Sequence, residues 1–502
     1  MLENGSRGLT ATRMGIDTQQ ELVVYMRSDC QVCRSEGFVA QTRVRLRLEE
    51  RYIIAKLNLV SAALLAPGSI GLSDSAWHKL GAAEGDRLRV EHPHYLTSLS
   101  FVRSKIFNNR LSAQAIRHII GDIAAGRYSD VHLAAFLTAC SGDRLDLPEI
   151  IDLTKAMVSV GKVLSWPGRS TVLDKHCVGG LPGNRTTPIV AAIVAAAGLT
   201  IPKTSSRSIT SPAGTADTME VLTGVELSLE QLQAVVGAEG ACLAWGGSIN
   251  ISPADDLLIR VERAINLDGE GQLIASVLSK KIAAGATHVI IDIPVGESAK
   301  VRSQKRARHL STLFAAVGNE LGIRVLPVIT DGRQPVGFGI GPALEAADVM
   351  AVLQRSPQAP VDLRRRALFL AGLLLELSDQ YAPGEGRAVA ESLLDSGSAW
   401  EKFRAVCRRQ GGLKSIPTAP YQRRICARTG GRVKSFDNRQ LAQIAKLAGA
   451  PKAKAAGIQL AKKLGDTVTA GELLMTIHAE TQGELRYAEN FYHRVENVCR
   501  IE

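Results

Sequence analysis

Aromatic side chains are scarce in this sequence, at 4% of 502 residues. Proteins that bind single-stranded nucleic acid without sequence preference stack bases on aromatic rings, so this scarcity argues against that class. No run of 18 or more apolar residues occurs, and we therefore expect no membrane-spanning helix. Residues 1–17 lack the apolar stretch of a secretion signal, which predicts a cytoplasmic protein.

Cysteine is used sparingly, with eight residues that we expect to be reduced thiols. Cys30 and Cys33 form one Cys-x-x-Cys, but a structural zinc needs four ligands and no second pair has a fitting spacing. No other His, Cys or Asp cluster has the spacing of metal ligands. The sequence therefore predicts no metal and no cofactor, and simple packing for the two cysteines.

Positive charge is in excess, with a formal net charge of +11. The simplest explanation of this charge is a solvated basic surface. A more specific explanation is that a positive field attracts a small anionic substrate. No long basic run dominates, so nucleic acid is not an expected partner. The length exceeds what one hydrophobic core normally supports, which predicts several domains.

Changes in hydrophobic period divide the chain. Residues 1–92 alternate short apolar runs with charges, which predicts a β-rich N-terminal domain. Helical spacing follows in 93–165, where Ser112, Ser129 and Pro148 open three predicted helices. These two regions are expected to be separate domains.

Strands and helices alternate from about residue 166 to 410. Predicted strands at 171–173, 288–293 and 325–329 are separated by helical segments, which indicates a mainly parallel sheet. Residues 411–502 return to short alternating strands and predict an α+β C-terminal domain. The predicted fold class is therefore a multi-domain α/β protein.

The most informative segment is DKHCVGGLPGNRTT, residues 174–187. We expect it to follow a strand and precede a helix, with three glycines that let backbone N–H groups converge on one point. The positive end of the helix favours an anion there, and Lys175 adds a full charge. The segment matches neither a Walker A loop nor a dinucleotide fingerprint. It predicts a phosphate cradle, with a plain glycine-rich turn as the alternative.

A second segment, residues 203–217, combines seven hydroxyl side chains with Arg207. Hydroxyl and backbone donors suit phosphate and sugar oxygens, and the arginine can pair with an anion or with Asp217. A serine-rich surface loop is the alternative interpretation.

Together the segments resemble the signature of the thymidine and pyrimidine-nucleoside phosphorylase family. The family's Lys-His-Ser-x-Gly-Gly appears as KHCVGG at 175–180, and its Ser-x-Arg…Gly-Thr-x-Asp…Glu pattern appears between 205 and 220. IASVLSKK at 274–281 resembles the nucleoside-binding helix. The resemblance runs from about residue 95 to the C-terminus. The extra N-terminal domain and the PGNRTT form of the loop resemble a longer branch that includes AMP phosphorylases.

This resemblance implies phosphorolysis of a nucleoside, thymidine and phosphate giving thymine and 2-deoxyribose 1-phosphate. Inorganic phosphate would be a co-substrate, and the chain would form a homodimer or larger assembly. Residues 253–283 would complete the helical domain. Residues 166–252 and 284–410 would form the phosphate-binding α/β domain.

The resemblance also implies roles for individual residues. Phosphate ligands would be Lys175, Gly180, Thr187, Ser205 and Thr215. Nucleoside or nucleotide contacts would come from Ser206, Arg207, Ser208, Ile209, Thr210, Ser211, Ser276, Lys280 and Lys300. The catalytic pair would be His176, beside the base, and Asp268, the proton donor.

Two departures from the family pattern stand out. Cys177 replaces a phosphate-binding serine, and a thiol is the poorer donor. The arginine that clamps the pyrimidine in shorter enzymes has no clear match, since Val261 falls at that position. Without the resemblance, Lys280 and Lys281 could equally form a solvated helix face, and Asp268 could simply cap a helix.

Three other functions stay open. An AMP-type enzyme would act on a nucleoside 5′-monophosphate and release ribose 1,5-bisphosphate, with Arg207 and Lys300 as candidates to bind the 5′-phosphate. An enzyme like anthranilate phosphoribosyltransferase shares the domain plan, but its pyrophosphate chemistry needs Mg²⁺ and acidic ligands. A non-catalytic binding protein is the third.

Overall fold

The computed structural model describes residues 8–18, 21–208, 211–249, 251–265, 267 and 269–502. The chain divides into two compact units. The first comprises residues 1–103 with 122–132, and the second comprises residues 104–121 with 133–502.

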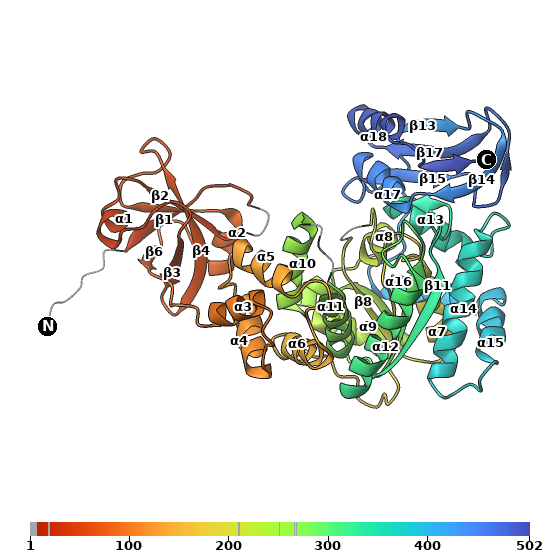
Figure 1. The fold of residues 1–502 in the computed structure, drawn as a ribbon, viewed down its shortest axis with the longest axis horizontal. Helices are drawn as coiled ribbons and strands as arrows, with labels where there is room; N and C mark the ends of the chain where they lie inside the picture. Colours follow the sequence, from red (N-terminus) through yellow and green to blue (C-terminus); the bar gives the residue numbers. More distant parts are fainter. Residues whose placement is uncertain (1–7, 19–20, 209–210, 250, 266, 268) are drawn as a thin grey trace. The chain divides into compact units, whose positions relative to one another are not determined.

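The first unit contains a closed β-barrel, with strand order β1-β5-β2-β4-β3-β6 (Figure 1). Its strands are β1 (Leu9–Arg13), β2 (Val23–Arg27), β3 (Arg43–Leu48), β4 (Arg51–Val60), β5 (Ser69–Leu72) and β6 (Arg87–Glu91). In β3 the apolar residues Val44, Leu46 and Leu48 are buried, whereas the arginines between them are less so. This alternation places one face of each strand inside, and closure removes exposed edges. Two short helices, α1 (Gln31–Glu36) and α2 (Asp74–Leu80), join the strands.

A group of helices follows the barrel in the chain: α3 (Ser98–Ile106), α4 (Ala113–Ala124), α5 (Asp130–Ala139) and α6 (Leu147–Ser159). The helices predicted from Ser112, Ser129 and Pro148 are confirmed as α4, α5 and α6. Helix α6 begins with a capping box, in which the Asp146 carboxylate accepts the N–H of Glu149 at 2.9 Å. It packs against α10 (Pro253–Ile265) and α11 (Glu270–Ala283).

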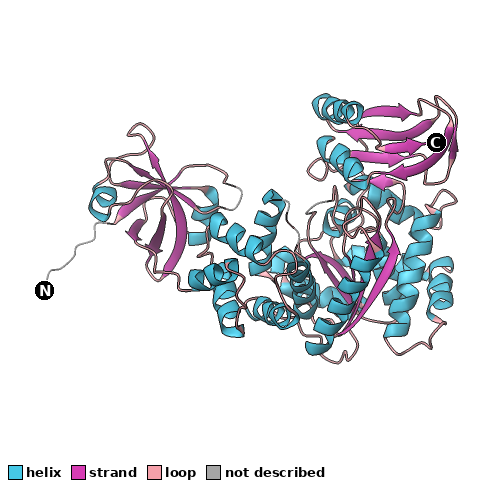
Figure 2. Cartoon of the chain, viewed as in Figure 1, coloured by secondary structure: helices cyan, strands magenta, loops and turns pink. Residues whose placement is uncertain are grey.

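Five parallel strands form the centre of the second unit (Figure 2). They are β7 (Leu173–Cys177), β8 (Ile201–Ser205), β9 (Ala241–Trp245), β10 (His288–Val295) and β11 (Arg324–Asp331). Their order is β11-β10-β7 and β8-β9, and a parallel bridge between Val172 and Thr200 joins the two groups. The predicted parallel sheet is therefore confirmed.

Helices cover this sheet and include one that is buried on all sides. They are α7 (Thr186–Ala196), α8 (Thr215–Leu222), α9 (Leu229–Glu239), α12 (Gln304–Glu320), α13 (Pro342–Leu353), α14 (Val361–Leu377), α15 (Gly386–Asp395) and α16 (Ser398–Arg409), with a short 3₁₀ turn at Gly246–Ile249. Every residue of α7 from Thr186 to Ala195 is buried, because neighbouring helices enclose it.

The strand before the glycine loop lies later in the chain than predicted. We expected it over 171–173, whereas β7 spans Leu173–Cys177, so Lys175 and His176 are strand residues. The prediction was wrong because charged residues normally mark a loop. Here Asp174 and Lys175 are 1% and 0% exposed and find polar partners inside the protein.

The C-terminal region is α+β, with an antiparallel sheet in the order β12-β15-β17-β13. Its strands are β12 (Gly339–Ile340), β13 (Tyr421–Cys426), β15 (Gly457–Leu460) and β17 (Leu473–Ala479), and a smaller sheet holds β14 (Gly431–Phe436), β16 (Thr467–Val468) and β18 (Cys499–Ile501). Helices α17 (Asn438–Leu447) and α18 (Gln482–Arg494) pack on each other and on the larger sheet. Strand β12 comes from the α/β part of the chain, so the two regions share this sheet.

Among the helices of the described residues, none combines the length and the apolar character needed to cross a bilayer.

Lys105→Met is expected to destabilise the helical region. Lys105 Nζ lies 2.6 Å from Glu149 Oε1, and both side chains are 2% exposed. Removing one partner of a buried ion pair typically lowers the free energy of unfolding by about 3–5 kcal/mol. Urea denaturation followed by circular dichroism measures the change. Arg110→Met is the control, since its exposed pair with Asp146 should contribute less than about 1 kcal/mol. Equal losses in the two variants would contradict the prediction.

Candidate active site

A cavity of about 150 Å³ lies at the carboxyl ends of β7 and β8. This is the edge at which open α/β sheets bind their ligands. The walls come from β7, the loop before α7, the segment between β8 and α8, and helices α10 and α11. The two polar segments singled out in the sequence therefore face one space.

Most of the predicted site residues line this cavity. They are Lys175, His176, Thr187, Ser205, Ser206, Arg207, Ser208, Ser211, Thr215, Ser276, Lys280 and Lys300. Gly180 lines an adjoining cavity and lies against Lys300, where a Cβ atom would come within 2.5 Å of the Lys300 backbone nitrogen. Ile209, Thr210 and Asp268 lie outside the described residues.

Asp174 is a buried carboxylate that pairs with two lysines of the cavity lining. Its Oδ1 accepts a hydrogen bond from Lys203 Nζ at 3.0 Å, and its Oδ2 lies 2.8 Å from Lys281 Nζ. Burial opposes ionisation, but the two ammonium groups outweigh it and lower the pKa of Asp174. One carboxylate thus holds β7, β8 and α11 together.

Lys175 points from β7 to the start of α7. Its Nζ donates to Thr186 Oγ1 at 2.7 Å and to Thr187 Oγ1 at 3.3 Å. Thr186 in turn donates to the Gly183 carbonyl at 2.7 Å. A buried ammonium group and two hydroxyls therefore meet at a helix N-terminus, the arrangement that suits a bound oxyanion.

His176 and Cys177 are both held in their neutral forms. Burial, followed by the positive charges of surrounding lysines, lowers the pKa of His176 well below its ordinary value. Burial raises the pKa of the Cys177 thiol to about 12. His176 can therefore donate one N–H near neutral pH, whereas Cys177 is a weak donor.

The segment between β8 and α8 is shaped by a buried carboxylate. Asp217 Oδ2 accepts the backbone N–H of Ser208 at 2.6 Å and that of Gly214 at 2.9 Å. Thr215 begins α8, so its backbone and hydroxyl lie at the positive end of that helix. Asp217 thereby fixes the backbone at Ser208, and pairing of β8 with β9 fixes Ser205.

Arg207 pairs with carboxylates. It forms two 2.8 Å hydrogen bonds with Glu220, a third with Glu226, and lies 3.7 Å from Asp217. Its guanidinium also stacks 4.7 Å above the Trp245 ring. The sequence suggested either an anion or Asp217 as the partner of Arg207. In the structure Arg207 lies near Asp217, but its main partner is Glu220. Its charge is therefore largely compensated.

Helices α10 and α11 supply the remaining wall. Lys280 Nζ donates to Ser276 Oγ at 3.3 Å and forms an ion pair with Asp255. Val261 is buried at 5% exposure, whereas Ile259 and Glu262 of the same helix face the cavity. The polar lining residues of this wall are Ser276, Lys280, Lys281 and Glu262.

A second cavity of about 700 Å³ adjoins the first and shares Ser211, Gly269, Leu273 and Lys300 with it. Its ionisable lining residues are Lys300, Arg302, Arg306, Arg439, Lys446 and Glu270. Five cations face one carboxylate there, so this space favours an anion.

Residues 99–161 match the family described as "Glycosyl transferase family, helical bundle domain", and residues 169–400 match its α/β domain. Residues 432–497 match "Pyrimidine nucleoside phosphorylase C-terminal domain". "Putative thymidine phosphorylase 1" of Acidovorax sp. (strain JS42) is 58% identical over 483 residues, covering 96% of this chain and 94% of that protein. "Putative thymidine phosphorylase" of Legionella pneumophila (strain Paris) is 57% identical and covers 96% of this chain and 93% of its own.

The chain belongs to the long branch of the thymidine and pyrimidine-nucleoside phosphorylase family. It is thus a nucleoside phosphorylase of the glycosyltransferase class. A solved structure, anthranilate phosphoribosyltransferase from Thermus thermophilus, matches with a TM-score of 0.52 at 20% identity, covering 62% of this chain and 98% of that one. At this identity the match shows a shared fold alone.

The sequence did not single out Lys203 and Lys281, which line the cavity, or Asp174, the carboxylate that both lysines contact. Lys281 was open to interpretation as part of a solvated helix face, but it is 3% exposed and paired with Asp174. Spacing on α11 could not reveal this, because the partner lies about a hundred residues away on β7. The aspartate directly before Lys175 was the available signal, since a charged residue there is unusual in a buried strand.

Across the described part of the chain, no group of three or more His, Cys, Asp and Glu residues is arranged to hold a metal ion. All eight cysteines are free thiols. Cys33 is buried in the barrel with its Sγ 3.9 Å from Met26 Sδ, in keeping with a packing role.

Lys281 is expected to make stability depend on pH. Burial lowers the pKa of Lys281 below its ordinary value of 10.5, so over the alkaline range below 10.5 the unfolded chain binds more protons than the folded one. Stability therefore rises with pH across that window. We expect the thermal midpoint of the wild type, relative to that of Lys281→Met, to increase from pH 7 to pH 9. A constant difference between the two proteins would show that the amine titrates normally.

Proposed function

We propose that this chain catalyses phosphorolysis of the N-glycosidic bond of thymidine, giving thymine and 2-deoxyribose 1-phosphate. The observation that carries the proposal is that residues of the 174–187 and 203–217 segments line one cavity together with Ser276 and Lys280. Family membership supports the reaction class, and the relatives' names support the nucleoside.

Phosphate would bind between the two segments. Lys175 supplies the charge, while Thr187, Ser205 and Thr215 supply hydroxyl donors from three elements. Gly179 and Gly180 adopt φ values of 89° and 81°, which turns the backbone sharply beside the cavity. Holding phosphate beneath the anomeric carbon converts an encounter into an oriented attack.

The departing base would be stabilised by donors from β7 and α11. As the C–N bond breaks, negative charge grows on the base while the sugar gains oxocarbenium character, as in glycoside cleavage generally. The neutral imidazole of His176 can donate one hydrogen bond, and Lys280 with Ser276 supplies two more donors. Donors fixed in place before the reaction stabilise this charge without reorganising. Asp268 stays our proposed proton donor.

A nucleoside 5′-monophosphate is the second candidate substrate, and the basic adjoining cavity favours it. Arg207 is a poor candidate for the 5′-phosphate because Glu220 and Glu226 already compensate its charge. Lys300 lines both cavities and lies beside Gly180. A 5′-phosphate bound there would extend from the nucleoside site into the positively charged space.

A substrate panel tests the reaction and separates the two candidates. Base release from thymidine, uridine, AMP and CMP is followed by chromatography with and without phosphate. We expect phosphate-dependent release of thymine, unchanged by EDTA. Release from AMP or CMP alone would establish the nucleotide reaction, and sensitivity to EDTA would favour phosphoribosyltransferase-like chemistry. Absence of phosphate-dependent release from all four would refute the proposal.

Lys175→Met is expected to raise the KM for phosphate at least about 10-fold, because hydrogen bonds to charged groups typically contribute about 1.5–3 kcal/mol. The KM for the nucleoside should change little, since Lys175 lies on the phosphate side. Steady-state kinetics with each substrate varied in turn measures both constants. Lys402→Met is the control, because that lysine pairs with Glu239 away from the cavity. A normal phosphate KM in Lys175→Met would contradict the assignment.

By family likeness we also propose a cytoplasmic homodimer or larger homo-oligomer. Sedimentation velocity on the purified chain tests the assembly state.

A further inference from the structure

The side chain of Arg185 is among the largest fully buried ones in the described residues, at 1% exposure. It lies at the N-cap of α7, directly before Thr186 and Thr187, the two residues that accept hydrogen bonds from Lys175. Arg185 does not line the cavity itself. A buried charge of this kind requires partners, because an unpaired one is strongly destabilising.

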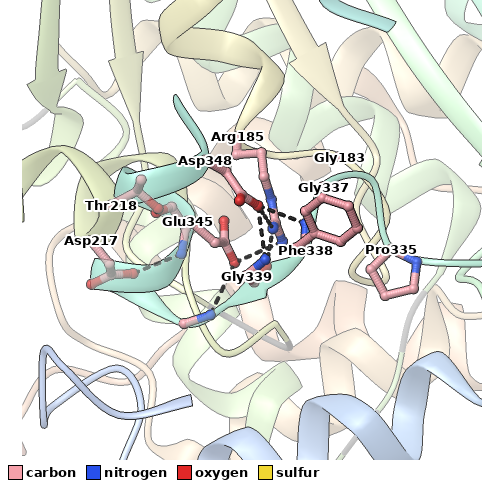
Figure 3. Close-up of polar contacts among 12 residues, drawn as sticks. Gly183, Arg185, Asp217, Thr218, Pro335, Gly337, Phe338, Gly339, Glu345 and Asp348 are labelled. Carbon is pink, nitrogen blue, oxygen red and sulfur yellow. Dashed lines mark hydrogen bonds and ion pairs between the residues drawn. The ribbon is translucent and has the colours of Figure 1, made fainter. Parts of the chain in front are cut away.

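The partners of Arg185 are two buried carboxylates and a backbone carbonyl (Figure 3). Arg185 Nη1 donates to Asp348 Oδ2 at 3.0 Å and to the Gly339 carbonyl, and Nη2 lies 3.3 Å from Glu345 Oε1. Asp348 Oδ2 also accepts the N–H groups of Phe338 and Gly339, each at 2.8 Å. The fit leaves no spare room, since a Cβ on Gly337 would lie 2.5 Å from Asp348 Oδ2.

The contacts of Arg185 are part of a path that connects the glycine loop to the C-terminal sheet. Val336 N–H donates to the Pro182 carbonyl at 2.5 Å, and the next strand, β12, pairs Gly339 with Gln459 of β15. From the C-terminal domain, Lys463 Nζ donates to the Pro335 carbonyl at 2.7 Å. The path thus runs from the C-terminal sheet through segment 335–341 and Arg185 to the threonines that hold Lys175.

We propose that Arg185 is a positioning residue for phosphate: its buried guanidinium serves as an internal cation that fixes the glycine loop to segment 335–341, and so makes the C-terminal domain a support of the phosphate site. The proposal rests on the proposed function. It assigns Arg185 no contact with substrate. Its effect passes through the start of α7 and the hydroxyls of Thr186 and Thr187.

The contacts favour an arginine at this position. Its Nη1 donates to the Gly339 carbonyl and to Asp348 while Nη2 lies near Glu345, whereas the ammonium of lysine is a compact point charge on a flexible stem. Arg185→Lys keeps the charge and loses part of the fork. Arg185→Ala leaves Asp348 and Glu345 buried without a cation, and the gap it creates is of a size that a guanidinium ion can enter.

The test compares Arg185→Lys and Arg185→Ala with a matched control, Arg364→Lys. Arg364 also bridges two carboxylates, Glu391 and Asp395, but on the exposed faces of α14 and α15. We expect Arg185→Lys to raise the phosphate KM about tenfold or more and to leave the nucleoside KM within about twofold, since only the phosphate loop loses its fixed geometry. Guanidinium chloride at millimolar concentration should partly restore the phosphate KM of Arg185→Ala alone.

Lys463→Gln extends the test to the C-terminal end of the path, where a smaller rise in the phosphate KM is expected. Equal rises of both KM values, or a lower thermal midpoint with unchanged kinetics, would overturn the proposal. If Arg185→Ala does not fold, Arg185→Lys and Lys463→Gln still decide the result.

Phosphate binding without nucleoside is measured by calorimetry on the same proteins. If the wild type releases no base from any nucleoside, the proposed function fails. Weaker phosphate binding in Arg185→Lys than in the wild type and Arg364→Lys would still support the positioning role, and equal binding would overturn it.

Discussion

The geometry of the cavity depends on one buried carboxylate. Asp174 lies within a strand, where a charge is normally excluded, and it is retained because Lys203 and Lys281 neutralise it from β8 and α11. Without Asp174 these two ammonium groups would repel each other beside His176. With it, they hold strands β7 and β8 and helix α11 at a fixed separation. The ion triad therefore ties the sheet to the helical wall of the cavity.

The same triad sets the electrostatics of the site. Two lysines against one aspartate leave a positive excess, to which Lys175 adds, and this excess reinforces the effect of burial in lowering the pKa of His176. The lysines therefore carry the positive charge that attracts an anion. The neutral His176 ring contributes a hydrogen-bond donor and no charge. Carboxylates near the other wall are compensated as well, since Asp255 pairs with Lys280 and Asp217 accepts backbone N–H groups. The cavity is thus arranged to receive negative charge.

Local patterns predicted the elements well and the long-range polar partners poorly. The helices opened by Ser112 and Pro148 carried their own signals in caps and spacing, so they could be placed before the structure was known. The end of β7 could not, because charges at Asp174 and Lys175 indicate a loop unless one knows that distant lysines and threonines satisfy them. Arg185 was hidden in the same way: its partners Glu345 and Asp348 lie some 160 residues on, and only the folded chain brings them together.

The thiol of Cys177 makes the contacts that hold the glycine loop more important. Where shorter family members carry a serine that binds phosphate, Cys177 is a neutral, buried thiol and a weak donor. In the proposed site, phosphate must then rely on Lys175, on hydroxyls from separate elements and on backbone N–H groups of the glycine loop. Backbone donors cannot reorient independently of the chain, so their strength depends on where the loop is held. A site that has lost one side-chain donor therefore depends more on the connection of its loop to segment 335–341, which is the connection that Arg185 makes.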